Sequence, residues 1–138
     1  MEQVRMRREV AGARVARVGT VDQQGRVHIV PVTFVVDRDT WYSPTDAGPR
    51  PPRRLRNLER DPRVTILIDT YDEDWARVWW VRLRGQGRIA DEPAEPERAR
   101  RMLIDKYPQF VNAPSDEGSG PIMAVAITDW SAWAYSGG

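Results

Sequence analysis

The densest group of chemically capable side chains in this sequence is a run of arginines between residues 50 and 63. The segment holds six arginines and only two acidic residues. Arg50 lies in a proline-rich stretch, and Arg53 and Arg54 stand where a short helix is expected to begin. Guanidinium forks and the free N–H groups at a helix start both bind phosphate or carboxylate. The segment therefore predicts an anion site, with a solvated helix face as the alternative.

A second candidate site surrounds the only histidine, His28. It is followed by an apolar, β-branched stretch, IVPVTFVV, that ends at residue 36. A strand with this mixture of apolar and polar side chains is able to form one wall of a pocket for a planar ligand. A lone histidine is also commonly a structural residue, so a functional and a structural role for His28 both stay open.

Two groups of tryptophans form a third feature. Three lie close together in the middle of the chain and two lie near its C-terminus: Trp75, Trp79, Trp80, Trp130 and Trp133. Tryptophan usually lies in a core or an interface, and it also stacks on planar rings. We favour a core or dimer-interface role and keep stacking on a ring system as the alternative.

The composition excludes several kinds of chemistry. With no cysteine and one histidine, the chain has no thiol nucleophile, disulfide, thiolate metal site or site with two histidine ligands. No pair of carboxylates has a spacing typical of acid–base catalysis, and Gly85-Gln86-Gly87 is not a dinucleotide motif because no helix follows it. We assign no catalytic residue and expect no metal. If the protein is an enzyme, the reactive atom belongs to a cofactor.

The length and the charge balance predict one globular domain spanning residues 1–138, of which 41% are hydrophobic. The net charge of +1 predicts no polyanionic partner, and we expect no nucleic-acid binding. The longest apolar run, residues 122–127, is too short to span a membrane, and the N-terminus predicts no signal peptide. We therefore expect no membrane contact and a cytoplasmic location.

The periodicity of apolar residues predicts the elements that must position these side chains. Helices are expected over residues 2–12, 53–60 and 96–107, and strands over residues 15–21, 26–36, 40–43, 64–69 and 81–89, with one or two more over residues 121–134. Residues 44–52 and 112–120 are expected to be loops. Pro31 places its strand at a sheet edge or a bulge, and Gly85 and Gly87 predict a tight bend. About seven strands, joined mainly by hairpins, predict an α+β barrel or sandwich.

Three motifs, taken in order, resemble one known family. They are the strand–turn–strand pattern VGTVDQQGRVHIVPVTFVVD, the segment RLRNLERDPRVTILID and the segment YDEDWARVWWVR. Together they look like the split-barrel flavin and deazaflavin family that includes pyridoxamine 5′-phosphate oxidase. Residues 71–82 are most similar to a subgroup thought to use the deazaflavin coenzyme F420. The resemblance covers residues 15–89 and, more loosely, residues 121–135.

This resemblance implies an α+β, mainly β domain, a six-stranded antiparallel split β-barrel of Greek-key type with peripheral helices. It also implies a homodimer with a cofactor in each of two grooves at the interface. By the family pattern, the residues that flank the cofactor's ring are His28, Pro31, Val32 and Thr33. Those that hold its phosphate, from the loop and the helix start, are Thr45, Arg50, Arg53 and Arg54. Trp75 is expected to enter the site from the partner subunit.

The sequence departs from the family pattern in two places. The family usually has a lysine at the position of Arg54 or, in another alignment, of Arg53. The preceding loop is longer by Pro51 and Pro52. Arginine binds phosphate bidentately, so anion binding survives the change. The choice of cofactor and the individual roles of these arginines stay open.

The resemblance predicts an oxidoreductase that uses F420, with FMN as the alternative cofactor, and that transfers a hydride to or from a small conjugated substrate. A non-catalytic carrier of flavin, deazaflavin or haem is the second hypothesis. A nucleic-acid or protein interaction module that uses the arginine segment, residues 50–63, is the third. The surplus of arginine favours F420, because that coenzyme carries a phosphodiester and a polyglutamate tail.

Overall fold

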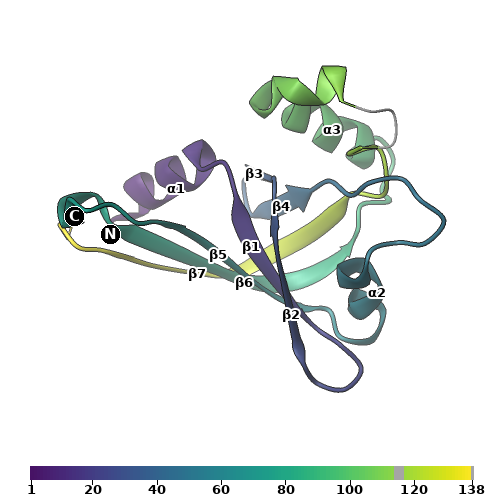
Figure 1. The fold of residues 1–138 in the computed structure, drawn as a ribbon, viewed down its shortest axis with the longest axis horizontal. Helices are drawn as coiled ribbons and strands as arrows, with labels where there is room; N and C mark the ends of the chain where they lie inside the picture. The colour runs from purple at the N-terminus through teal and green to yellow at the C-terminus, as the bar shows by residue number, and fades with distance from the viewer. Residues whose placement is uncertain (114–116, 138) are drawn as a thin grey trace.

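The computed structural model describes residues 1–113 and 117–137, in which α-helices lie on one side and at one end of one curled antiparallel sheet (Figure 1). The helices are α1 (Gln3–Gly12), α2 (Arg53–Arg60) and α3 (Glu95–Lys106), with short 3-10 helices η1 (Trp75–Arg77) and η2 (Pro108–Asn112). The strands are β1 (Ala16–Val21), β2 (Val27–Val32), β3 (Val35–Asp37), β4 (Thr40–Ser43), β5 (Arg63–Thr70), β6 (Trp79–Ile89) and β7 (Met123–Ala134). Within the expected loop 112–120, residues 114–116 lie outside the described residues. No helix among the described residues has the length and apolar character needed to cross a membrane.

The two edge strands of the sheet, β2 and β3, are consecutive in the chain. The strand order is β2-β1-β5-β6-β7-β4-β3, and each neighbouring pair is antiparallel. Only Thr33 and Phe34 separate the two edges. The sheet therefore curls until its edges meet at this short joint. In the described residues, β2 and β3 are joined by the chain but not by ladder hydrogen bonds, so the barrel is closed covalently and left open between these strands. This is the arrangement of a split barrel.

The described residues form seven strands, so the expectation of a six-stranded barrel was wrong. One strand was expected over residues 26–36, but the ladder stops after Val32 and resumes at Val35. Between them, the N–H of Phe34 donates to the Tyr107 hydroxyl at 3.2 Å, and the carbonyl oxygen of Phe34 lies 3.2 Å from the same hydroxyl. A side chain thus takes the place of a strand partner and divides the expected strand in two.

The inner face of the sheet carries the core. Phe34 stacks on Trp41 with ring centroids 6.1 Å apart, and α1 covers this face with Met6 and Val10. Alternate side chains of β2, β1 and β5 point the other way, because successive residues of a strand face opposite sides. On that outer face Val27, Ile29 and Leu67 are 66%, 61% and 38% exposed.

Two expected strand irregularities are confirmed. Pro31 lies in β2, which is an edge strand and has a neighbour, β1, on one side only. An edge strand tolerates a proline, which has no N–H for the ladder. The pairing of β6 with β7 shifts between Arg84 and Gly85, which is a β-bulge. A Cβ at Gly85 would collide with the carbonyl of Ala126, so only glycine permits this close approach.

A buried carboxylate joins α3 to the sheet. Glu95 is 3% exposed and accepts two hydrogen bonds from Arg88, both at 2.8 Å, and one from the Tyr42 hydroxyl at 2.7 Å. These bonds, above all those from Arg88, lower the pKa of Glu95 to about 2. Tyr107 follows directly after α3, so this anchor also helps to hold the joint at Phe34.

We expect Glu95→Gln to lower the free energy of unfolding by on the order of 2 kcal/mol at pH 7, because it removes a buried, charge-assisted bond. The pKa of Glu95 lies below its usual 4.5 in the folded state, so its contribution is complete above that pH and is lost as the pH falls towards about 2. Denaturant titrations between pH 7 and 2 should show a weaker acid dependence in the variant than in the wild type.

The matched control is Asp61→Asn, which removes a carboxylate with a pKa of about 2 that pairs with the exposed Arg63. Water screens that pair, so its loss should change stability much less. Equal effects of the two substitutions would contradict the anchoring role of Glu95.

Candidate functional site

Helix α2 is fixed to the β1–β2 hairpin by a buried hydrogen bond. The Asn57 amide donates to the Thr20 hydroxyl at 3.0 Å, and the two residues are 7% and 1% exposed. Thr20 pairs with His28 across the antiparallel ladder. Arg53 lies one turn before Asn57 on the same face of the helix. The bond therefore places the start of α2 next to His28.

His28 is half-buried, and its Nδ1 is shielded from solvent with no hydrogen-bond partner among the described residues. Burial lowers the pKa of His28 below its usual 6.5, the guanidinium groups of Arg53 and Arg54 lower it further, and Asp22 opposes them. The imidazole is therefore neutral at pH 7 in a positive environment. This environment favours an anionic ligand that also bonds to a ring nitrogen.

The start of α2 holds guanidinium groups that form no ion pair within the described residues. Arg54 donates from Nη2 to the Pro44 carbonyl at 3.2 Å, whereas its Nε and that of Arg56 are shielded and unpartnered. Burial lowers the pKa of Arg54, and Asp46 partly opposes this effect. Shielding a charge without a counter-ion costs free energy. A bound anion would therefore stabilise this end of the helix.

A pocket of about 290 Å³ lies between α2 and the proline-rich loop that precedes it. Arg50, Arg54 and Thr45 are among the residues that line it. The Thr45 hydroxyl is already used, because it donates to the Pro121 carbonyl at 2.5 Å. Asp46 accepts from the Gly118 N–H at 2.8 Å. The loop is therefore held in place from the other side by residues 118–121.

The end of β2 borders the same region. The Thr33 carbonyl accepts from the hydroxyl of Ser43 at 2.7 Å, and Ser43 directly precedes Pro44 at the pocket. Val32 alternates with Pro31, so Val32 is half-buried on the inner side and Pro31 is exposed on the outer side. Val32 packs against the core, and none of Pro31, Val32 and Thr33 is among the residues that line this pocket.

Trp75 lies at the opposite end of the sheet from α2. It belongs to η1, beyond the end of β5, whereas α2 precedes the start of β5, and eight strand residues span roughly 25 Å (Figure 1). Trp75 is 57% exposed, packs edge-on against Tyr135 at 5.9 Å and lies 3.5 Å from the Tyr71 hydroxyl through Nε1. Within one chain, Trp75 is therefore not brought to the other expected site residues.

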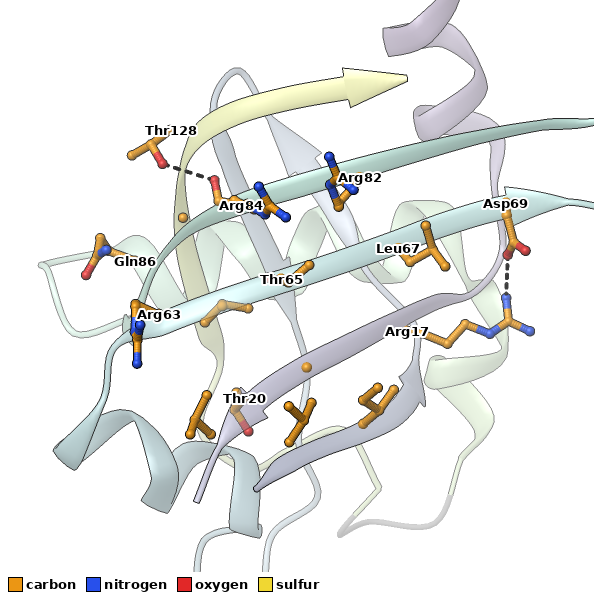
Figure 2. Close-up of a pocket in the computed structure, with 16 residues that line it drawn as sticks. Arg17, Thr20, Arg63, Thr65, Leu67, Asp69, Arg82, Arg84, Gln86 and Thr128 are labelled. Carbon is orange, nitrogen blue, oxygen red and sulfur yellow. Dashed lines mark hydrogen bonds and ion pairs between the residues drawn. The ribbon is translucent and has the colours of Figure 1, made fainter. Parts of the chain in front are cut away.

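The open face of the sheet carries a larger hollow, the outer groove, which was not predicted from the sequence (Figure 2). Its volume is about 1030 Å³. The residues that line it include Gly19, Val27, Ile29, Thr65, Leu67, Arg17, Arg63, Arg82 and Arg84. The alternating arginines of residues 81–89 did indicate an exposed face. The groove itself needs β2, β1, β5 and β6 side by side, which periodicity does not reveal.

The described residues contain no group of three histidine or acidic side chains placed to hold a metal ion. The donors near His28 are guanidinium groups and N–H groups, which bind anions and repel cations. The chemistry of the site is therefore that of anion binding.

The profile of the family described as pyridoxamine 5′-phosphate oxidase matches residues 3–134 of the sequence. The chain belongs to the pyridoxamine 5′-phosphate oxidase family. This confirms the family resemblance drawn from the three motifs. Comparison with the curated proteins gives no match.

Solved structures share the fold of this family member. A conserved hypothetical protein from Mycobacterium tuberculosis is 19% identical with a TM-score of 0.78, over 97% of this chain and 85% of that one. The FAD binding protein from Mycobacterium smegmatis is 19% identical with a TM-score of 0.73, over 98% of each chain. A haem storage protein from Vibrio cholerae is 16% identical with a TM-score of 0.68, over 95% of this chain and 90% of that one. At these identities the likeness is one of fold.

The charge around His28 is measurable because the chain has one histidine. In an NMR titration we expect the pKa of this imidazole to lie below 6.5 and to rise towards that value in Arg53→Gln/Arg54→Gln, since the nearby positive charges are removed. Asp22→Asn alone should lower the pKa of His28 below its wild-type value, because the Asp22 carboxylate favours the protonated imidazole. The matched control is Arg60→Gln, which changes an arginine of the same helix that bonds to Gln23. An unchanged pKa in the double variant would contradict the placement of α2.

Proposed function

We propose that this protein is a cytoplasmic, cofactor-dependent oxidoreductase that binds F420, with FMN as the alternative, at the start of α2. The observation that carries the proposal is the set of guanidinium groups that face His28 and form no ion pair among the described residues. Such a donor set is complementary to the phosphate of a nucleotide-like cofactor. Membership of the family and the fold shared with an FAD binding protein support it.

The residues present fit such a group. Arg53 and Arg54, together with Arg50 in the adjoining pocket, supply positive charge and hydrogen-bond donors for the phosphate. The neutral His28 lies beside this donor set, and its shielded Nδ1 has no hydrogen-bond partner among the described residues. When bound, the cofactor supplies the hydride chemistry that no side chain here provides. The protein's own residues bind it, orient it against a small-molecule substrate and exclude water.

The surplus of arginine supports F420 over FMN. Besides Arg53 and Arg54, Arg50 and Arg56 also form no ion pair within the described residues. Two guanidinium forks satisfy one phosphate, so the additional ones are available to a longer anionic tail. A phosphodiester followed by several carboxylates provides such a tail.

A cofactor carrier is the second candidate. A haem storage protein shares the fold, and a neutral imidazole with an unpartnered nitrogen is the form of histidine that ligates haem iron. In this alternative the same site holds a haem or a flavin without turnover.

We also propose that the protein is a homodimer joined through the outer faces of two sheets. The exposed apolar side chains of Val27, Ile29 and Leu67 share one face, and burying them against a second copy is favourable. In a two-fold dimer with its axis across the strands, the η1 end of one copy lies near the α2 end of the other. Trp75 would then complete the partner's cofactor site.

Titration of the purified protein with F420 and with FMN tests this function. We expect micromolar or tighter binding of F420, seen in ligand absorbance and in quenched tryptophan fluorescence. Arg53→Ala/Arg54→Ala should weaken binding by about tenfold or more, because two charge-assisted bonds are lost. Arg60→Ala is the matched control on the same helix. Light scattering on the same samples should give the mass of a dimer.

Binding of neither cofactor would overturn the proposal. Unchanged affinity in the double variant would overturn the phosphate site. Tight binding without consumption of the reduced cofactor across a panel of conjugated substrates would establish the carrier instead.

A further inference from the structure

We propose that Asp46 is a specificity-determining residue of the pocket that precedes α2, and that its carboxylate disfavours phosphate monoesters relative to phosphodiesters. A monoester carries about 1.5 to 2 negative charges at pH 7, whereas a diester carries a single one. Of the two candidate cofactors, FMN is a phosphate monoester and F420 contains a phosphodiester. The inference rests on the proposed function where it concerns these cofactors, whereas the preference between simple esters does not depend on that function.

The pocket before α2 contains charges of both signs. Its lining includes two arginines, Arg50 and Arg54, and one acidic residue, Asp46, so that one positive charge is in excess. The Asp46 carboxylate is close enough to Arg54 to oppose the effect of burial on the pKa of that guanidinium. Within the described residues, however, no ion pair within 4.0 Å joins Asp46 to either arginine. Both guanidinium groups are therefore left for a ligand, which also meets the field of the carboxylate.

The carboxylate of Asp46 is held in place by the segment that precedes β7. Its Oδ1 accepts from the Gly118 N–H at 2.8 Å. The Gly120 N–H donates to the Thr45 carbonyl at 2.8 Å. A Cβ at Gly120 would collide with the Asp46 carbonyl, so the two backbones lie in close contact there. These contacts keep the negative charge at the pocket when a ligand is bound.

Helix α3 anchors the same segment from the other side. Arg100 donates from Nη2 to the carbonyl of Gly120 at 2.6 Å and to that of Ser119 at 3.4 Å. The segment is thus bonded both to α3 and to the loop that carries Asp46. The position of the carboxylate therefore depends on the packing of α3, and not only on the loop itself.

The charge of Asp46 acts on a ligand in proportion to the ligand's own charge. The repulsion between the carboxylate and a bound dianion is, in free energy, about twice that of a monoanion at the same place. Asp46 is exposed, so water and salt screen this repulsion. We expect a loss of affinity of about threefold for each negative charge on the ligand. The carboxylate thus lowers the affinity for a monoester more than the affinity for a diester.

Two small esters that share a phenyl group test the preference without a cofactor. They are phenyl phosphate, a monoester, and methyl phenyl phosphate, a diester. Their binding is followed by NMR through the backbone amides of Ala47 and Gly48, which line the pocket. Asp46→Asn removes the charge but keeps a side-chain oxygen that accepts from the Gly118 N–H. This variant should bind the diester about threefold and the monoester about tenfold more tightly than the wild type does.

Two further variants locate the effect, and the NMR spectrum of each shows whether it is folded. Asp46→Glu retains the negative charge and should keep the ratio of the two affinities near that of the wild type. Asp61→Asn makes the same chemical change at the other end of α2. The eight residues of this helix span about 12 Å, which exceeds the screening length in physiological salt, so the ratio should not change.

The same variant shifts the choice of cofactor. In Asp46→Asn the affinity for FMN should rise about threefold relative to the affinity for F420, because only FMN presents a monoester. Titrations followed by ligand absorbance at equal ionic strength measure both affinities. Asp61→Asn again serves as the control.

An unchanged ratio of ester affinities in Asp46→Asn would overturn the proposal, because a carboxylate that only holds Gly118 would affect both esters equally. An equal shift in Asp61→Asn would overturn it as well, since the cause would then be net charge. Failure of both esters to bind to the wild-type protein would also overturn it. The expected ester ratios in a protein that binds neither FMN nor F420 would overturn the proposed function but support the role of Asp46.

Discussion

The joint at Thr33 and Phe34 is the constraint on which the rest of the structure depends, because it connects the two edges of one sheet. Its position is fixed from outside the sheet. The Tyr107 hydroxyl lies 3.2 Å from both polar backbone atoms of Phe34, and the ammonium of Lys106 lies 3.8 Å from the centre of its ring. The Ser43 hydroxyl holds the Thr33 carbonyl. Helix α3 and strand β4 thus determine where β2 ends, and β2 carries one side of the candidate site.

The alternation of side chains along the β1–β2 hairpin separates two surfaces with different chemistry. Thr20 and His28 face inward, where α2 brings guanidinium groups without counter-ions to them. Val27 and Ile29 face outward, onto the floor of the outer groove. Both surfaces leave arginines unpaired within the described residues, although the chain as a whole has a net charge of only +1. The nearly balanced total thus conceals two local surpluses of positive charge.

Elements that depend on neighbouring residues were predictable from the sequence. The helix at 53–60 and the strand at 40–43 match, because proline, turn residues and short-range periodicity determine their ends. The division of the strand at Phe34 was not predictable, because Tyr107 lies 73 residues further along the chain. The family pattern assigns His28, Arg53 and Arg54 to one cofactor site; in the structure the two guanidinium groups lie near enough to lower the pKa of His28, and their binding of a cofactor stays a prediction. The outer groove was missed, because four strands from distant segments must align to form it.

The central claim is that the start of α2 is an anion site facing His28. It is tested most directly by following the His28 imidazole by NMR while inorganic phosphate is added, with chloride at equal ionic strength as the control. Bound phosphate neutralises the guanidinium charges that lower the pKa of His28, so the pKa should rise with phosphate and not with chloride. A pKa that responds equally to both salts would contradict the claim.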